Sequence, residues 1–107
     1  MKVRFNREEM AEALAAVCSV TAQRTPKPIL QCVRIEARSD AVLLSATDLE
    51  ISLRFAVTQV EVTTPGDTVV VADTLSRIVR ECSDELLTFE TKATLLHIRG
   101  AGSHFQV

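Results

Sequence analysis

The sequence predicts a single α+β domain over residues 1–107, built by internal duplication of a β-α-β-β-β unit. One strand pattern, one helix pattern and three strand patterns occur twice in the same order, and the second copy begins near residue 66. The strand patterns follow one another in runs separated by turn residues, which indicates antiparallel pairing. We therefore expect two helices that pack side by side on an antiparallel sheet layer.

The first copy opens with a short strand and a helix. Val3 and Phe5 alternate with charged residues, which is typical of a strand with one buried face. Asn6 stands three residues before Glu9, the spacing of an N-cap and its capping-box partner. Apolar residues then recur at helical spacing in MAEALAAV, so we expect a helix from about residue 7 to residue 19.

Three strands are expected after this helix. The prolines of TPKP end helical structure, and alternating apolar residues from Ile29 to Ala37 then predict the first strand. AVLLSA and LEISLRFAV follow as the second and third strands, and every second residue from Leu49 to Val57 is apolar. This alternation predicts a strand with one dry face. Thr47-Asp48 forms the corner between the two strands, because an Asp side chain accepts hydrogen bonds from turn amides.

The second copy begins after TTPGDT, residues 63–68, whose Pro, Gly and Asp indicate a turn. TVVV is the expected strand and ADTLSRIVREC, residues 72–82, is the expected helix. Asp73 lies in the first turn of that helix, where a carboxylate complements the helix dipole. LLTFE, TLLHIR and SHFQV complete the copy as three further strands.

The charge and composition exclude several classes of protein. The net charge is −2, divided as +1 over residues 1–54 and −3 over residues 55–107, so the chain is not a strongly basic nucleic-acid binder. It has no Trp or Tyr, which argues against a stacking platform for single strands. Three widely spaced cysteines suggest no disulfide framework, and no apolar run is long enough for a signal or membrane segment. We expect a cytoplasmic protein without a membrane partner.

The sequence shows no convergent set of catalytic residues. His97 is expected to be a surface histidine on a strand, and His104 has no partner at a metal-binding spacing. The three glycines form no phosphate-binding loop. We therefore predict a protein that is not an enzyme and has no catalytic residue, metal site or cofactor.

PIL at 28–30, SATDLEISL at 45–53 and PGDTVVVA at 65–72 resemble, in this order and separation, the N-terminal domain of the bacterial sliding clamp. This clamp is the beta subunit of DNA polymerase III, and the resemblance runs from REEM to the closing GAGSHFQV. It implies the DNA-clamp fold, a three-domain chain, and a ring of two chains joined head to tail around duplex DNA. Such a processivity factor tethers the polymerase by topology, without catalysis or sequence preference. DNA polymerase and the clamp loader would bind mainly through the later domains.

The resemblance also assigns candidate DNA-contacting residues. Arg24 lies in a polar loop and matches a family position that touches DNA, although a solvated loop arginine would have the same appearance. Arg7, Arg77 and Arg80 lie on the helices and could face the hole, as could the arginines of any solvated helix. Asp73 departs from the family, which often has a basic residue there, so the second helix is a weaker candidate for contact with DNA.

The last strand is the candidate protomer interface, because the family places the edge of this domain there. Its candidate residues are His104, Phe105, Val107 and, on the neighbouring helix, Ile78. Core packing is an equal alternative for Ile78. An exposed apolar edge also predicts self-association of the isolated domain through residues 103–107. Two other functions stay open, a generic α+β protein-interaction module without a DNA role and an enzyme that borrows residues from a partner.

Overall fold

A computed structural model describes residues 1–21, 28–47, 52–102 and 104–107. Two helices and several short strands make up the described chain. In order, the elements are β1 (Lys2–Asn6), α1 (Arg7–Cys18), the 3₁₀ helix η1 (Pro28–Gln31), β2 (Cys32–Ala37), β3 (Val42–Thr47), β4 (Ser52–Val57), β5 (Val60–Thr64), β6 (Gly66–Val71), α2 (Ala72–Glu81), β7 (Leu86–Lys92), β8 (Leu95–Arg99) and β9 (His104–Gln106).

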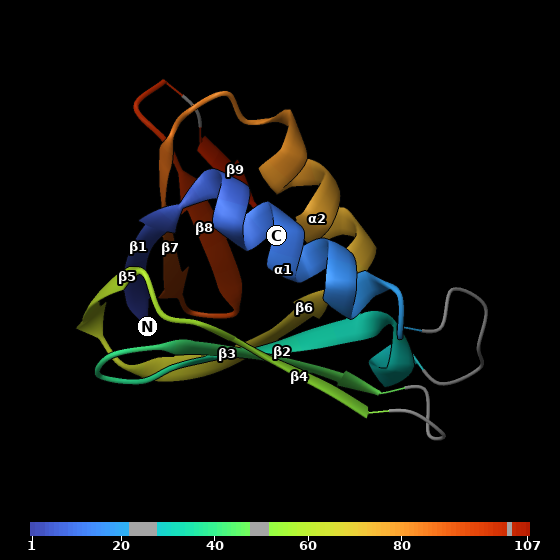
Figure 1. The fold of residues 1–107 in the computed structure, drawn as a ribbon. Helices are drawn as coiled ribbons and strands as arrows, with labels where there is room; N and C mark the ends of the chain where they lie inside the picture. Colours follow the sequence, from blue (N-terminus) through green and yellow to red (C-terminus); the bar gives the residue numbers. More distant parts are fainter. Residues whose placement is uncertain (22–27, 48–51, 103) are drawn as a thin grey trace.

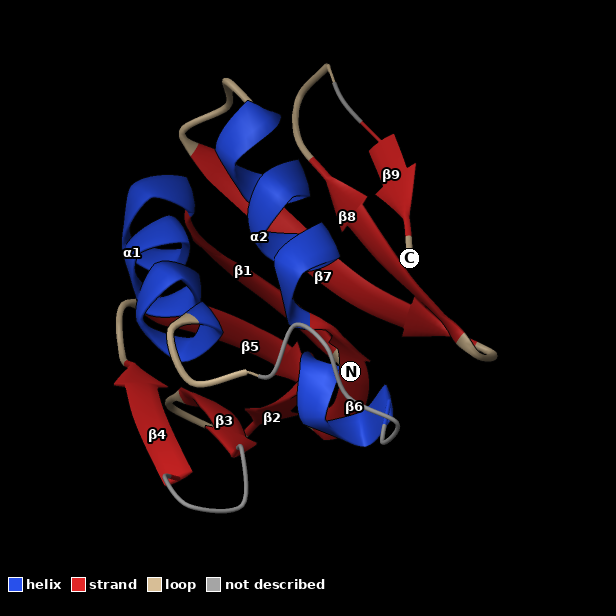
Figure 2. Cartoon of the chain, turned by 90° about the vertical axis from the view of Figure 1, so that its right-hand side faces the viewer, coloured by secondary structure: helices blue, strands red, loops and turns tan. Residues whose placement is uncertain are grey.

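The strands form two antiparallel sheets, ordered β5-β1-β7-β8-β9 and β4-β3-β2-β6. Helices α1 and α2 lie side by side and pack against the inner side of the sheets, α1 on β3 and β4 and α2 on β2 and β6 (Figures 1 and 2). The α+β class and the duplication are confirmed. The expected single sheet layer consists instead of two sheets. The strands pair in two separate groups, and each group contains strands of both copies.

The two copies exchange their opening strands. β1 opens the first copy and pairs with β7 of the second, while β6 opens the second copy and pairs with β2 of the first. Phe5 on β1 and Phe89 on β7 meet edge to face at 4.5 Å between ring centroids, and both are buried. Each copy therefore completes the other's sheet, and the core is shared between them.

The helices begin and end close to the predicted residues. The Asn6 side chain accepts a hydrogen bond from the Glu9 amide at 3.1 Å, which confirms the N-cap of α1. Met10, Leu14 and Val17 are buried, as the helical spacing predicts. Among the described residues, no side chain caps the start of α2, where Val71 occupies the cap position.

Three expectations about the strands are wrong or incomplete. Ile29 lies in η1 rather than in a strand and is 63 % exposed, because β2 begins only at Cys32. Phe55 on the predicted dry face of β4 is 37 % exposed, because β4 is an edge strand. The predicted turn at 63–68 contains the end of β5 and the start of β6, which belong to different sheets.

Gly66 makes the crossing between the two sheets possible. Its φ of +155° is a conformation that other residues rarely adopt, and a Cβ there would lie 3.3 Å from the Cβ of Met1. A single residue, Pro65, separates β5 from β6. The sharp corner thus depends on the PG pair that the sequence singled out.

Candidate DNA-facing helices and edge strand

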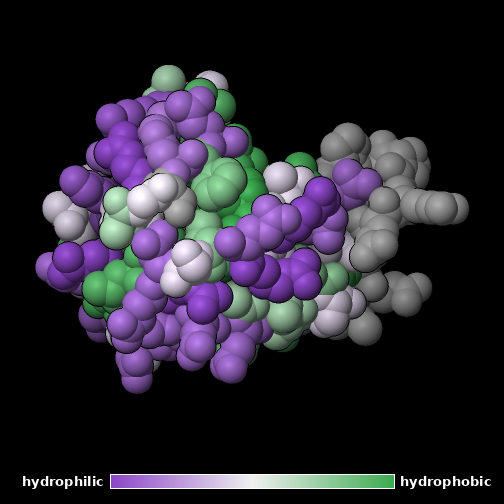
Figure 3. Space-filling model, turned by 90° about the horizontal axis from the view of Figure 1, so that it is seen from above, coloured by the Kyte–Doolittle hydropathy of each residue, from purple (hydrophilic) through white to green (hydrophobic). Residues whose placement is uncertain are grey.

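The outer faces of α1 and α2 carry charges of both signs. Five acidic and three basic residues lie on the two helices, which gives a net charge of −2. They are Arg7, Glu8, Glu9, Glu12, Asp73, Arg77, Arg80 and Glu81. Seen from above, hydrophilic residues predominate and hydrophobic residues form small separate patches (Figure 3). This helix layer suits weak contact with a polyanion better than tight binding, because phosphate contacts need an excess of cations.

Arg7 is the first residue of α1 and is half-buried. Its Nε donates a hydrogen bond to the backbone carbonyl of Asp84 at 3.0 Å, and its own amide donates to the carbonyl of Glu85 at 2.9 Å. These bonds join the start of α1 to the segment that leads into β7. Arg7 therefore has a structural role as well as any contact with DNA.

Arg77 and Arg80 are exposed on α2. Arg77 Nη2 lies 3.1 Å from Asp73 Oδ2, one helical turn earlier. The carboxylate of Asp73, where the family often has a basic residue, therefore offsets the positive charge of Arg77. Arg80 Nε lies 3.4 Å from the Ser76 carbonyl oxygen, a long and weak hydrogen bond. Arg24, the remaining candidate, lies outside the described residues, as does Asp48 of the hairpin corner.

Strand β9 is the edge of the five-stranded sheet and pairs only with β8 among the described strands (Figure 2). Leu96 and Val107 exchange two backbone hydrogen bonds of 2.9 Å. Phe105, Val107 and Ile78 are half-buried and pack against the core cluster, so each has both a core side and an accessible side. Three of the four candidates for a protomer interface thus combine core packing with an accessible side, two of them at the open strand edge and one on α2.

The histidines differ from what the sequence suggested. His97 is only 9 % exposed rather than a surface residue, and His104 has a partner after all. His97 Nδ1 lies 3.0 Å from His104 Nε2, with the rings stacked at 5.2 Å between centroids. Residue spacing does not reveal this pair, because the two histidines belong to no sequence motif. The pairing of β8 with β9 brings them together.

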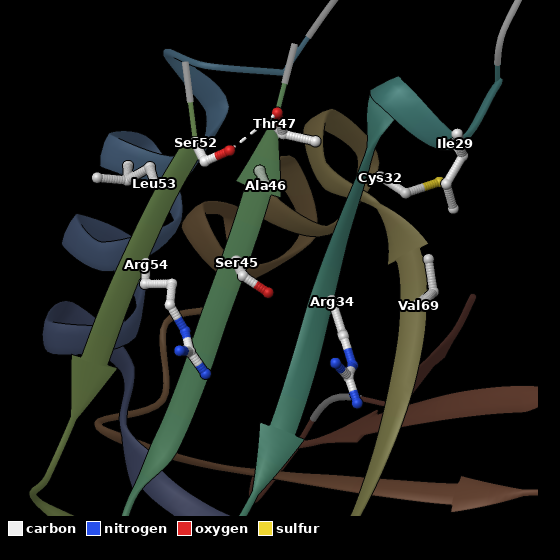
Figure 4. Close-up of a pocket in the computed structure, with 10 residues that line it drawn as sticks. All are labelled: Ile29, Cys32, Arg34, Ser45, Ala46, Thr47, Ser52, Leu53, Arg54 and Val69. Carbon is white, nitrogen blue, oxygen red and sulfur yellow. Dashed lines mark hydrogen bonds between the residues drawn. The ribbon is translucent and has the colours of Figure 1, made fainter. Parts of the chain in front are cut away.

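The outer face of the four-stranded sheet has a depression of about 330 Å³ that sequence reasoning missed. Arg34 and Arg54 extend on either side of Ser45, and Ile29 and Val69 line its apolar side (Figure 4). Arg34 is bound to Asp67 at 2.9 Å, which offsets one of the two cations. Nothing in the structure shows what would occupy this open, mixed surface.

Residues 1–21, 28–47, 52–102 and 104–107 contain no group of three or more His, Cys, Asp or Glu side chains placed to hold a metal ion. In the same ranges, no helix has the length and apolar character needed to cross a membrane. Burial raises the pKa of the Cys18 thiol despite a hydrogen bond with Ser76, which makes this cysteine a poor nucleophile at neutral pH.

The duplicated unit, with two adjacent helices covering two antiparallel sheets, defines the DNA-clamp class of fold. The family model for the DNA polymerase III beta subunit, N-terminal domain, matches residues 1–107. The chain belongs to this family. The family match favours the clamp reading over a generic interaction module, which the sequence alone left open.

Individual relatives agree with the family match. The beta sliding clamp of Caulobacter vibrioides is 34 % identical over an alignment of 113 residues, gaps included, which covers all of this chain and 29 % of the relative. The beta sliding clamp of Chlamydia pneumoniae is 31 % identical over 93 residues, covering 87 % of this chain and 25 % of that protein. The solved structure of Caulobacter crescentus pol III beta superposes with a TM-score of 0.92 at 30 % identity, covering 98 % of this chain and 28 % of that one. The chain thus spans between a quarter and a third of the relatives' length.

Proposed function

We propose that residues 1–107 are the N-terminal domain of a processivity factor, a ring that encircles duplex DNA and tethers the replicative polymerase. The observation that carries this proposal is the match of the whole chain to the clamp family, both in sequence and in fold. The domain would perform no catalysis. Since clamps act on DNA in bacteria, the domain would work in the cytoplasm.

The charge of the helices supports holding by topology rather than by affinity. A protein that neutralises many phosphates binds DNA tightly and with a steep salt dependence. The helices of this chain carry more acidic than basic residues, so they would let DNA slide past. Arg24, Arg7, Arg77 and Arg80 are the proposed weak phosphate contacts, which would carry no sequence information.

The open edge of β9 supports a role in closing the ring. His104, Phe105 and Val107, with Ile78 of α2, are the proposed contacts with a second chain. An edge strand offers unpaired backbone groups and accessible apolar side chains to a partner strand. The proposed ring contains two copies of a three-domain chain, and DNA polymerase and the clamp loader would bind mainly to the later domains.

Primer extension tests the function. The complete gene product that contains this chain is added with its clamp loader to the replicative polymerase on a primed single-stranded circle. We expect products made in one binding event to lengthen by an order of magnitude or more, because a tethered polymerase does not diffuse away. Product lengths that do not change would contradict the proposal.

The coding sequence beyond codon 107 tests the proposed domain organisation. A three-domain chain requires about two further domains' worth of residues, each with the duplicated strand and helix pattern. A stop codon directly after Val107 would contradict a ring of two chains.

A further inference from the structure

The only two histidines of the chain meet on the outer face of the five-stranded sheet. His97 on β8 stands opposite Gln106, and His104 on β9 stands opposite Arg99, so the histidines are diagonal neighbours on the same face. Diagonal residues on antiparallel strands are close enough for aromatic side chains to touch. Their facing nitrogens, His97 Nδ1 and His104 Nε2, are 3.0 Å apart. The pair is a specific side-chain link between an edge strand and the sheet.

Strand β9 is a short strand at the edge of its sheet. It has three residues, and β8 is its only partner among the described strands. Its backbone pairs with β8 at His97–Gln106, Ile98–Phe105 and Arg99–His104, and two hydrogen bonds between Leu96 and Val107 follow next to its end. Phe105 is half-buried against the core. The contact between the two histidines adds a side-chain link to this backbone ladder.

We infer that the His97–His104 pair is a clasp that positions β9 on β8, and that a second proton on the pair opens it. In the neutral pair, one ring donates its N–H and the other ring accepts. With one proton added, the charged ring donates to the neutral ring, which is a stronger, charge-assisted bond. With two protons added, both facing nitrogens carry hydrogen and neither can accept.

The surroundings keep the clasp closed at neutral pH. The charged groups that face the pair are Arg99 on β8 and Glu90 and Lys92 on β7. Glu90 Oε1 is engaged by Arg99 Nη1 at 3.3 Å and by Lys92 Nζ at 4.0 Å. Burial lowers the pKa of His97 from its ordinary value of 6.5; His104, Arg99 and Lys92 add to this effect and Glu90 opposes it. The lowered pKa keeps His97 neutral to a lower pH than an ordinary histidine.

The consequence for ring closure rests on the proposed function. If β9 is the strand that meets a second chain, the clasp sets the position of that strand, and acid that opens the clasp weakens the pairing of the two chains. The clasp itself is a property of this chain alone. It can therefore be tested without DNA and without a second chain.

Amide hydrogen exchange of the 107-residue chain, followed by NMR at a concentration where sedimentation shows a monomer, tests the clasp. The variants are His97→Thr, His104→Thr and the double variant, because Thr suits a strand and is too short to bridge the gap. We expect each single variant to lower the protection of the Leu96 and Val107 amides about two- to tenfold, the range of one hydrogen bond. The double variant should lose no more than the larger single loss, because the two changes remove the same interaction. Gln106→Ala on the same face is the control and should leave the protection nearly unchanged.

A pH series on the unaltered chain provides an independent readout. Protection at Leu96 and Val107 should fall as acid adds the second proton to the pair, while the core amides stay protected. Unchanged protection at Leu96 and Val107 throughout the acid series, or losses that add in the double variant, would overturn the clasp. Since neither readout involves DNA, such a failure would leave the proposed function standing, and a failed primer-extension test would leave the clasp standing.

Discussion

At the residue scale, ion pairs and hydrogen bonds occupy the helix arginines that would approach DNA. Arg77 lies beside Asp73, an exposed pair of the kind that stabilises a helix by only about 0.3–0.5 kcal/mol. Arg7 Nε is bound to a backbone carbonyl within the domain. A phosphate could therefore compete easily for Arg77 and less easily for Arg7. Such an arrangement favours brief contacts over a fixed complex.

Removing the carboxylate beside Arg77 should strengthen DNA contact. We predict that Asp73→Asn in the complete clamp increases DNA affinity at low salt, because Arg77 loses its competing partner. The same change should lower the stability of the domain by about 0.3–1 kcal/mol, because Asp73 lies in the first turn of α2 and complements its dipole. Fluorescence anisotropy with duplex DNA and urea unfolding measure the two effects. Unchanged or weaker DNA binding would argue against α2 as a DNA-facing helix.

Replacing Arg24 should have the opposite effect. We predict that Arg24→Ala lowers clamp retention on DNA and reduces the slope of log K against log salt by about 0.9, the effect of one lost phosphate contact. Arg38→Ala is the matched control, because Arg38 lies in the turn between β2 and β3 and is bound to Glu36 at 3.0 Å. Equal retention of both variants across a salt series would refute a DNA contact by Arg24.

At the element scale, the exchange of opening strands makes the two copies depend on each other. Phe5 and Phe89 lie at the junction where β1 of one copy meets β7 of the other. We predict that Phe89→Ala lowers the free energy of unfolding by about 3–5 kcal/mol, through lost burial and a cavity. Phe55→Ala, at a 37 % exposed position, is the control and should cost clearly less. Urea unfolding should show one transition for both copies, and two separate transitions would contradict a shared core.

The helices and most strands could be predicted because their signals are local. Asn6 and the apolar spacing set α1 within one residue of its observed end, and the repeat placed α2 equally well. Strand β5 was missed although Val60 and Val62 alternate with Glu61, because the turn signal of TTPGDT dominated that segment. The division into two sheets and the histidine pair depend on pairing between strands, which residue spacing does not encode.

At the scale of the whole molecule, the open edge of β9 should drive self-association. Since Val107 bonds to β8, the alternation of an antiparallel ladder directs the Gln106 amide away from the sheet. We predict that the 107-residue chain associates with increasing concentration in sedimentation, and that Gln106→Pro abolishes this by removing the outward donor. Gln106→Ala keeps that donor and should still associate. A monomer at every concentration would contradict an interface at β9.

The most direct test of the central claim compares circular with linear DNA. The complete gene product is loaded onto a nicked circular duplex, and its retention is followed by gel filtration before and after one restriction cut. A ring that holds DNA by topology stays on the circle and slides off the ends once the circle is cut. Equal retention on circular and linear DNA would show binding by affinity and would contradict the account.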